Sequence, residues 1–299
     1  MMIIDIQYRS FEETLLACSV RGGVDLVITS PPYCDARTAS AYGTAESWRE
    51  EQYKTLGDAC FAALKPGGHA IVNVDAPVRE WRKGFGTERG FHAWRMMLDW
   101  AERVGFRVPD RLAFGRHGLP GAYGGRFRND WEPLLWFQKP GADGHFDKAS
   151  LDAPSPYGGG GVTTQRRADG TMYSRVASGA AVDGGITRRG TLWSYGGTGH
   201  GQSGSADLEA TGHPARFPLR LALDAVACFS PVGGIVCDPF MGSGTSAVAC
   251  ATLERNVIGG DLGARETDGR RWADIATERT MAIVDPAQKT LWSEHGVAS

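Results

Sequence analysis

The sequence contains no long apolar run, no paired cysteines and no recognisable leader. No stretch approaches the roughly 20 apolar residues that a membrane helix needs. The first residues, MMIIDIQYRS, lack the basic region and the cleavage site of a signal peptide, so we expect a cytoplasmic protein. The six cysteines stand singly, without a C-x-x-C pair or a histidine at metal-ligand spacing. We therefore expect reduced thiols and no metal site.

A strong excess of charge is also missing. The formal net charge of the 299 residues is −2, which argues against wholesale coating by nucleic acid. One local exception runs from Arg103 to Lys139, where seven basic and three acidic residues give a balance of +4. A basic surface and an ordinary solvated face explain this balance equally well.

Both ends of the chain alternate between strand-like runs and stretches of helical period. Strands are predicted for MMIIDI, VDLVITS, HAIVNV, RVPDRLAF, EPLLWFQK, GGIVCDPF and NVIGGDL. Helices are predicted for SFEETLLACSV, WREEQYKTLGDACFAALKPGG with KPGG as its stop, FHAWRMMLDWAERVGF, FPLRLALDAVACFS, GTSAVACATLE and RRWADIATERTMAIV. This alternation predicts an α/β fold with a mostly parallel sheet and helices on both faces.

The middle of the chain has a different composition. Residues 140–210 are dominated by glycine, serine, threonine and arginine and show no sustained periodicity. Their aromatic residues favour a loop-rich module, while disorder in parts of it stays open. We predict that this segment interrupts one domain made of residues 1–139 and 211–284, and that residues 285–299 form a frayed tail.

A glycine turn follows one of the predicted strands. IVCDPFMGSGTSAVA places Gly242 and Gly244 between a strand and a helix, with Ala247 completing the pattern G-x-G-x-x-A. Asp261 ends the next strand, 19 residues after Gly242, where a carboxylate can accept hydrogen bonds from a ribose. These residues predict an adenosine-type cofactor. Asp238 would repel a pyrophosphate at this turn and suits a cationic amine, which favours S-adenosylmethionine over a dinucleotide.

A second motif ends another strand. In VITSPPY, a run of β-branched residues stops at Pro31 and Pro32, which hold the backbone in one stiff conformation. SPPY, followed much later by HPARFP and DPFMGSGT, resembles the signature of DNA amino-methyltransferases, which methylate the exocyclic nitrogen of adenine or cytosine. The order of the motifs is similar to that of the permuted β group of this family. The resemblance covers residues 1–139 and 211–284 and implies a Rossmann-like S-adenosylmethionine-dependent methyltransferase fold.

The resemblance implies roles for the SPPY residues. The side chain of Ser30 and the carbonyl of Pro31 would accept hydrogen bonds from the amine of a base flipped out of double-stranded DNA. Tyr33 would stack on that base, and Pro32 would help to hold the ring and the acceptors at a fixed separation. A strong general base is not required, because the sulfonium already activates the transferred methyl group.

The resemblance also implies the cofactor contacts. They map to Asp5 near the adenine ring, Phe217 against the cofactor, Asp238 and Phe240 at the methionine end, Gly242, Ser243, Gly244 and Thr245 in the turn, and Asp261 at the ribose. One departure is the stretch IGGDL, where family members commonly carry a glutamate in an IGIE-like stretch. The shorter carboxylate of Asp261 can still reach a ribose.

The target base and the DNA contacts are less well determined. Serine before Pro-Pro is more usual among cytosine-N4 enzymes, whereas the size and layout look like orphan adenine methyltransferases of bacteria and prophages. We therefore expect adenine N6 narrowly, with cytosine N4 as the alternative. In residues 140–210, taken as the target-recognition segment, the arginines available for phosphates or guanine edges are Arg166, Arg167, Arg175, Arg188 and Arg189. Arg126 and Arg128 are candidates for the cleft near the flipped base, or for a solvent-exposed loop.

Other functions stay open at this point. They are a non-catalytic DNA-binding protein on a methyltransferase scaffold, an NAD-dependent oxidoreductase, and an enzyme that methylates an RNA or protein amine. The sequence also allows a homodimer, and it does not decide whether a restriction enzyme accompanies the protein.

Overall fold

The structure is a computed structural model that divides into two compact units. One unit comprises Met1–Phe146 and Thr191–Ser299, and the other comprises Asp147–Gly190. The residues that the structure describes are 2–32, 50–75, 78–80, 87–115, 127, 129–154, 162–176, 186–187, 189–195 and 218–285.

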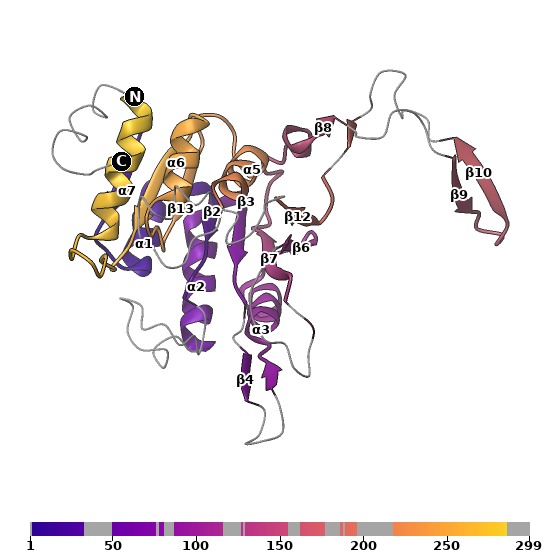
Figure 1. Cartoon of the computed structure of the whole chain (residues 1–299), viewed down its shortest axis with the longest axis horizontal. Helices are drawn as coiled ribbons and strands as arrows, with labels where there is room; N and C mark the ends of the chain where they lie inside the picture. The colour runs from indigo at the N-terminus through magenta and orange to yellow at the C-terminus, as the bar shows by residue number, and fades with distance from the viewer. Residues whose placement is uncertain are drawn as a thin grey trace. The chain divides into compact units, whose positions relative to one another are not determined.

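The larger unit is built on one eight-stranded sheet (Figure 1). The strand order is β1-β14-β13-β2-β3-β7-β6-β12. β7 runs antiparallel to its neighbours β3 and β6, and every other neighbouring pair is parallel. The strands are β1 Ile4–Gln7, β2 Val24–Thr29, β3 Leu64–Asn73, β6 Arg111–Gly115, β7 Trp131–Gln138, β12 Leu192–Ser194, β13 Ile235–Asp238 and β14 Asn256–Gly260. The mostly parallel sheet predicted from the sequence is confirmed.

Helices cover both faces of this sheet. α1, α2 and α3 pack in sequence along one face, and α5, α6 and α7 along the other, as Figure 1 shows. The helices are α1 Phe11–Val20, α2 Glu50–Ala63, α3 His92–Asp99, α5 Leu219–Phe229, α6 Thr245–Thr252 and α7 Trp272–Val284. A π-helical turn, Trp100–Val104, continues α3. The predicted α/β fold with two helical layers is therefore correct.

Local sequence explains where these elements begin and how they pack. α1 starts at a capping box, because Ser10 Oγ accepts from the Glu13 N–H while the Glu13 carboxylate accepts from the Ser10 N–H. The strand β2, VDLVIT, is buried along almost its whole length, as expected for a central strand covered on both faces. On the α2 side, the fully buried Trp100 donates from Nε1 to the carbonyl oxygen of Tyr53 at 2.9 Å.

One boundary differs from the sequence-based expectation. The stretch KPGG was expected to stop a helix, and α2 does end just before it, at Ala63. However, β3 already begins at Leu64, so KPGG belongs to the strand. The reason is pairing with the chain after β7: the Gly67 N–H donates to the Lys139 carbonyl, and the Lys139 N–H donates to the Gly68 carbonyl, both at 2.9 Å.

Short strands occupy the loop-rich segment. Leu192–Ser194 forms β12 and pairs with β6, so the main sheet extends into residues 140–210. In the smaller unit, β8 pairs with β11 and β9 pairs with β10, both antiparallel. The remaining elements are β4 Val78–Glu80 and β5 Thr87–Arg89 in the larger unit, and the 3-10 helix Lys148–Leu151, β8 Ala153–Pro154, β9 Val162–Arg166, β10 Met172–Val176 and β11 Ile186–Thr187 in the smaller one.

Five of the six cysteines lie in the part of the chain that the structure describes. Five cysteines are buried and free, and Cys34 lies outside the described residues. Among the described helices, none is long and apolar enough to cross a membrane. Within the same residues, no cluster of three or more histidine, cysteine or acidic side chains is arranged to hold a metal ion.

Candidate active site

The ends of β13 and β2 lie side by side in the sheet. The two strands are parallel, and Cys237 pairs with Val27. Asp238, which ends β13, and Thr29, which ends β2, therefore meet at the carboxyl edge. The strand order diverges here, because β14 and β1 lie beyond β13 while β3 and β7 lie beyond β2. In open α/β sheets, such a switch point is where ligands bind.

A buried hydrogen bond joins the two strand ends. Thr29 Oγ1 donates to Asp238 Oδ1 at 2.8 Å, across 209 residues of sequence. Only 1% of Thr29 and 2% of Asp238 are exposed. The same carboxylate accepts from the Phe240 N–H at 3.1 Å and from Ser246 Oγ at 2.5 Å. Asp238 therefore fixes β2, the loop after β13 and the first turn of α6 relative to one another.

This carboxyl group is electrostatically unusual. Burial raises the pKa of Asp238 to about 6, from an ordinary value of 3.8. The three hydrogen bonds lower the pKa and the nearby Asp261 raises it, so burial decides the direction. Within the part of the chain that the structure describes, no lysine, arginine or histidine forms an ion pair with Asp238. A bound cation would therefore stabilise its ionised form.

The glycine turn is held against the end of the next strand. The Asp261 carboxylate accepts from the Gly242 N–H and from the Gly263 N–H, both at 2.7 Å. Asp261 is 2% exposed, so the second predicted carboxylate is as deeply placed as the first. The Met241 N–H also donates to the carbonyl of Gly260 at 3.0 Å. The structure thus brings Asp238, the turn and Asp261 together, as the sequence predicted.

The helix α7 also packs closely against the glycine turn. Gly244 has a φ of +87°, and a Cβ atom there would lie 2.7 Å from the Cβ of Ala276. Arg279 Nη1 donates to the carbonyl oxygen of Ser243 at 2.5 Å. Ser243 and Thr245 are both buried on either side of this glycine. Only glycine satisfies both the left-handed backbone and the close helix.

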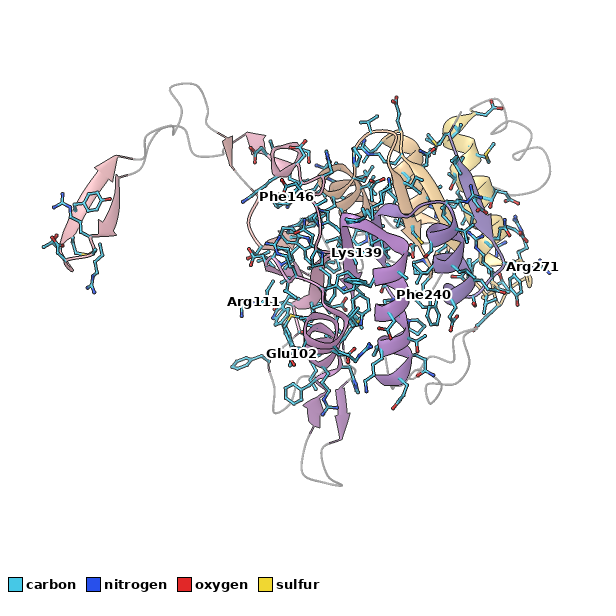
Figure 2. All side chains as sticks on the ribbon, turned by 180° about the vertical axis from the view of Figure 1, so that it is seen from behind. Glu102, Arg111, Lys139, Phe146, Phe240 and Arg271 are labelled. Atoms are coloured by element: carbon cyan, nitrogen blue, oxygen red, sulfur yellow. The ribbon has the colours of Figure 1, made fainter. Side chains whose placement is uncertain are left out.

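One part of the departure IGGDL, the glycine at position 260, has a packing reason. A Cβ atom on Gly260 would lie 1.9 Å from Oγ1 of Thr14, which is completely buried in α1. Position 260 therefore has no room for the bulkier residue of the IGIE-like pattern. On the same side of the sheet, Phe240, labelled in Figure 2, stacks on Phe11 of α1 with ring centroids 5.4 Å apart. α1 thus packs against both the turn and the strand that carries Asp261.

The residues after β2 are anchored from α2. Ser30 is half-buried, Pro31 is buried and Pro32 is half-buried. The hydroxyl of Tyr53 donates to the Pro32 carbonyl at 2.9 Å. Tyr53 is itself 2% exposed, so its ring is held in the core. Tyr33 lies outside the described residues.

The predicted cofactor residue Asp5 has charged partners of its own. Asp5 was expected at the end of the first strand, but β1 continues to Gln7, so Asp5 lies inside the edge strand. Its carboxylate accepts from Arg21 at 2.9 Å and lies 3.6 Å from Arg9 Nη1. Asp5 therefore makes local ion pairs in the structure. Phe217 lies outside the described residues.

The predicted DNA-binding arginines lie mainly in the smaller unit. Arg166 and Arg167 are exposed at the β9 end of a hairpin, and Arg189 is half-buried. Arg175 belongs to β10, but its side chain lies outside the described residues, as do Arg126, Arg128 and Arg188.

Two of the basic residues between 103 and 139 have internal partners. Arg103 donates to the carboxylates of Asp58 and Asp99 at 2.8 Å. Lys139, labelled in Figure 2, donates from Nζ to the carbonyl oxygens of Phe61 and Leu64 at 2.7 Å. These two cations therefore contribute to the fold, and the local charge of +4 overstates the basic surface.

Sequence reasoning missed four residues of this cluster. Thr29 and Ser246 adjoin the two motifs, and their hydroxyl groups next to a buried acid were the available signal. Tyr53 and Arg279 carried no signal, because their contacts depend on how α2 and α7 pack.

The donor set can be tested against the predicted cofactor. The buried carboxylate of Asp238 beside the glycine turn disfavours a pyrophosphate and suits a ligand with a positive charge. S-adenosylmethionine carries an ammonium, a sulfonium and a ribose and has no phosphate. Asp238 and Asp261 therefore both fit this cofactor, and Asp238 argues against NAD.

Comparisons with known proteins agree with this geometry. The sequence matches the DNA methylase family over residues 24–268. The orphan methyltransferase M.BamHII of Bacillus amyloliquefaciens is 29% identical over 262 residues, covering 86% of this chain and 88% of that protein. The type II methyltransferase M.ScaI of Streptomyces caespitosus is 32% identical over 267 residues, covering 86% and 75%.

Solved structures show the same fold. TTHA0409 of Thermus thermophilus, complexed with S-adenosyl-L-methionine, superposes with a TM-score of 0.57 at 20% identity, covering 95% of each chain. The PvuII DNA methyltransferase, named as cytosine-N4-specific, superposes with a TM-score of 0.56 at 18% identity, covering 88% of this chain and 86% of that one.

The matches favour a methyltransferase over the oxidoreductase and over the non-catalytic scaffold. The family match spans most of the chain. The strand order places β13, which leads to the glycine turn, next to β2, which leads to the SPP segment. The chain therefore belongs to the DNA methylase family, as an enzyme of the N6/N4 amino-methyltransferase type that uses S-adenosylmethionine and acts on DNA.

Proposed function

We propose that this protein is a site-specific DNA methyltransferase that modifies the exocyclic amine of a base flipped out of the duplex. The observation that carries the proposal is the buried hydrogen bond from Thr29 to Asp238. It ties the residue that precedes Ser30 to the residue that begins the loop leading to the glycine turn. A methyl donor held at the turn and a base held at the SPP segment would then lie next to each other, as direct transfer requires.

The base-binding residues would act by position. An amine conjugated to an aromatic ring is a weak nucleophile, because its lone pair is delocalised. We infer that Ser30 Oγ and the Pro31 carbonyl accept from the two amine N–H groups and favour a tetrahedral nitrogen. Tyr33 would stack on the extruded ring and offset the cost of unpairing it, a few kcal/mol. The bond from Tyr53 to Pro32 would keep this backbone from relaxing.

The cofactor-binding residues would act by charge and shape. S-adenosylmethionine supplies an activated methyl group on a sulfonium. We infer that Asp238 and Phe240 face the methionine end, that Asp261 accepts from the ribose, and that Phe217 packs on the cofactor. Gly242, Ser243, Gly244 and Thr245 would shape the turn. Asp5 stays a weaker proposal for the adenine ring, because its carboxylate is engaged by Arg9 and Arg21.

The wider assignments follow from the same family. We propose the permuted β-group order, in which the catalytic motif precedes the cofactor motifs. We also propose that residues 140–210, of which Asp147–Gly190 forms a compact unit, recognise the target sequence. The enzyme would act in the bacterial cytoplasm on nucleoid DNA. Orphan status and a homodimer are further proposals, which methylome analysis and the mass of the purified protein would test.

The target base has two candidates. The layout of the chain favours adenine N6. Ser30, at a position where adenine enzymes more usually carry aspartate or asparagine, favours cytosine N4. Cytosine N4 is therefore the second candidate, and one experiment decides between them.

The test is methyl transfer to DNA by the purified chain. Plasmid DNA is incubated with tritiated S-adenosylmethionine, digested to nucleosides and separated by chromatography coupled to mass spectrometry. We expect label in N6-methyladenine or N4-methylcytosine, and a large loss with Ser30→Ala at unchanged cofactor affinity. Label in 5-methylcytosine, in RNA alone or in protein alone would overturn the proposal.

A further inference from the structure

The β9–β10 hairpin is a ribbon with a rigid tip. β9 and β10 pair only with each other among the described strands, as Figure 1 shows. The last pair joins Arg166 to Met172, and the Arg167 N–H donates to the Thr171 carbonyl at 2.8 Å. The Asp169 carboxylate accepts from both the N–H and the hydroxyl of Thr171, at 2.9 and 2.7 Å. The tip, residues 167–171, therefore has one defined shape.

The two neighbouring arginines of this hairpin have different surroundings. The guanidinium carbon of Arg167 lies 4.8 Å from the centre of the Tyr173 ring. Tyr173 pairs with Gln165 and Met172 pairs with Arg166, so Arg166 lies on the ribbon face opposite to Tyr173. The exposed side chain of Arg166 makes no hydrogen bond or ion pair with the described residues. Arg167 is thus pre-organised by stacking, whereas the side chain of Arg166 has no partner among the residues that the structure describes.

Pre-organisation decides which arginine suits which contact. A guanidinium stacked on an aromatic ring has already lost much of its rotational freedom, and its donor edge stays available. That is the requirement for a bidentate contact with O6 and N7 of guanine, the commonest specific contact in the major groove. A phosphate contact demands only a positive charge within reach. Arg167 therefore fits base reading and Arg166 fits phosphate binding.

The charge of the tip also favours contact with base edges over contact with phosphates. Asp169 lies at the apex and is fully solvated, and its hydrogen bonds from Thr171 lower its pKa, so it is ionised at neutral pH. A carboxylate at the apex repels phosphates, but it can accept from the amine of cytosine in the major groove. The apex is therefore suited to base edges, while Arg166 behind it is suited to the phosphates along the groove.

We propose that the β9–β10 hairpin enters the major groove of the target DNA, where Arg167 reads a guanine and Arg166 binds a phosphate. The major groove, about 12 Å wide, admits a two-stranded β-ribbon. This inference rests on the proposed function, because it assumes that the enzyme methylates a specific DNA sequence. It assigns the sequence preference to one side chain of the smaller unit.

The test compares Arg167→Gln with its neighbour Arg166→Gln. Both variants lose one charge from the same hairpin, so they control for each other. Sequencing the modified DNA of cells that express the wild-type chain first gives the recognition sequence. Duplexes with this sequence, and duplexes with each base pair changed singly, then serve as substrates for methylation and binding.

The two variants should behave differently. For Arg167→Gln we expect the preference for one guanine to fall about tenfold to a hundredfold, while the other positions keep theirs. For Arg166→Gln we expect weaker binding to all duplexes alike and a salt dependence whose slope falls by about 1. Tyr173→Leu should lose part of the same preference as Arg167→Gln, because the stacking is removed. Tyr173→Phe, which keeps the ring face, should retain that preference.

Several outcomes would overturn the inference. The hairpin does not read the DNA if Arg167→Gln keeps every preference, or if it weakens all duplexes equally. Circular dichroism and S-adenosylhomocysteine binding serve as checks on folding. The residues of the glycine turn belong to the other unit, so a correctly folded hairpin variant should still bind S-adenosylhomocysteine. If the wild-type chain methylates no DNA, the proposed function itself fails. If it methylates a specific sequence but the hairpin variants change neither its DNA binding nor its sequence preference, this inference alone fails.

Discussion

Replacing Asp238 by asparagine should make the protein more stable at neutral pH and should weaken cofactor binding. The side chain is 2% exposed, and burial raises its pKa to about 6 from 3.8. Asparagine keeps the shape and one oxygen acceptor for Thr29. The hydroxyl of Ser246 can turn to accept from the new amide, so the local structure should survive.

The sign of the pH effect follows from proton binding. Between about pH 4 and about pH 6 the native carboxyl group keeps a proton that the unfolded chain has released. The folded state therefore binds more protons, and its contribution to stability is complete below about pH 4 and is lost as the pH rises to about 6. The loss corresponds to about 3 kcal/mol, from the difference between the two pKa values.

The assay is urea denaturation of the wild-type protein and Asp238→Asn at pH values from about 4 to about 7.5. Other groups titrate in both proteins, so the difference between their free energies of unfolding isolates Asp238. We expect the stability of the wild type relative to the variant to fall by about 3 kcal/mol over this range. A difference that stays flat, or that rises with pH, would refute the reasoning.

Cofactor binding should show the opposite trend. S-adenosylmethionine is a cation at its methionine end, so it should bind the ionised Asp238 and its affinity should increase as the pH rises to about 6. Titration calorimetry with S-adenosylhomocysteine, which keeps the ammonium group, measures this directly. The asparagine variant should bind at least tenfold more weakly, with little dependence on pH in this range. A variant that binds as tightly as the wild type would show that Asp238 does not face the cofactor.

Three further substitutions test the contacts around the turn. Thr29→Val removes a buried hydrogen bond to a carboxylate and should cost about 1.5–3 kcal/mol in urea denaturation. It should also raise the KM for S-adenosylmethionine, because it raises the pKa of Asp238, and an unchanged KM would contradict this. Tyr53→Phe frees the Pro32 carbonyl and should lower kcat several-fold at unchanged cofactor affinity, which single-turnover kinetics would detect; wild-type kcat would argue against an anchoring role. Gly244→Ala forces a Cβ atom onto Ala276 at a φ of +87° and should cost about 1–3 kcal/mol or more. A thermal melt equal to that of the wild type would refute the steric argument.

The regular elements could be predicted because their periodicity is strong. The strand β2 is a run of β-branched and apolar residues, and the helix α5 repeats its apolar positions at helical spacing. β12 was missed because its three residues, Leu192–Ser194, lie in a glycine-rich stretch, and their pairing with β6, which is distant in the sequence, gives no local signal. The π-helical turn at Trp100–Val104 also gave no sequence signal, since its residues have the spacing of an ordinary helix.

The candidate site could be predicted only in its parts. SPPY and DPFMGSGT each pointed to a binding edge, and a parallel α/β sheet made it reasonable that they meet. The bond between Thr29 and Asp238 required the strand order, which the sequence does not state. Tyr53 and Arg279 reach the site from α2 and α7, so their roles depend on helix packing. The ion pairs that engage Asp5 were hidden for the same reason.

The central place of β13 has a consequence for how the protein is made. β13 fills the gap between β2 and β14, although β2 leaves the ribosome more than two hundred residues earlier. Until Ile235–Asp238 has been synthesised, one edge of the apolar strand β2 has no neighbouring strand to pair with. An unpaired strand edge promotes misassembly. Truncated products should aggregate, and none of them could modify the genome, because the reactive centre exists only once translation is nearly complete.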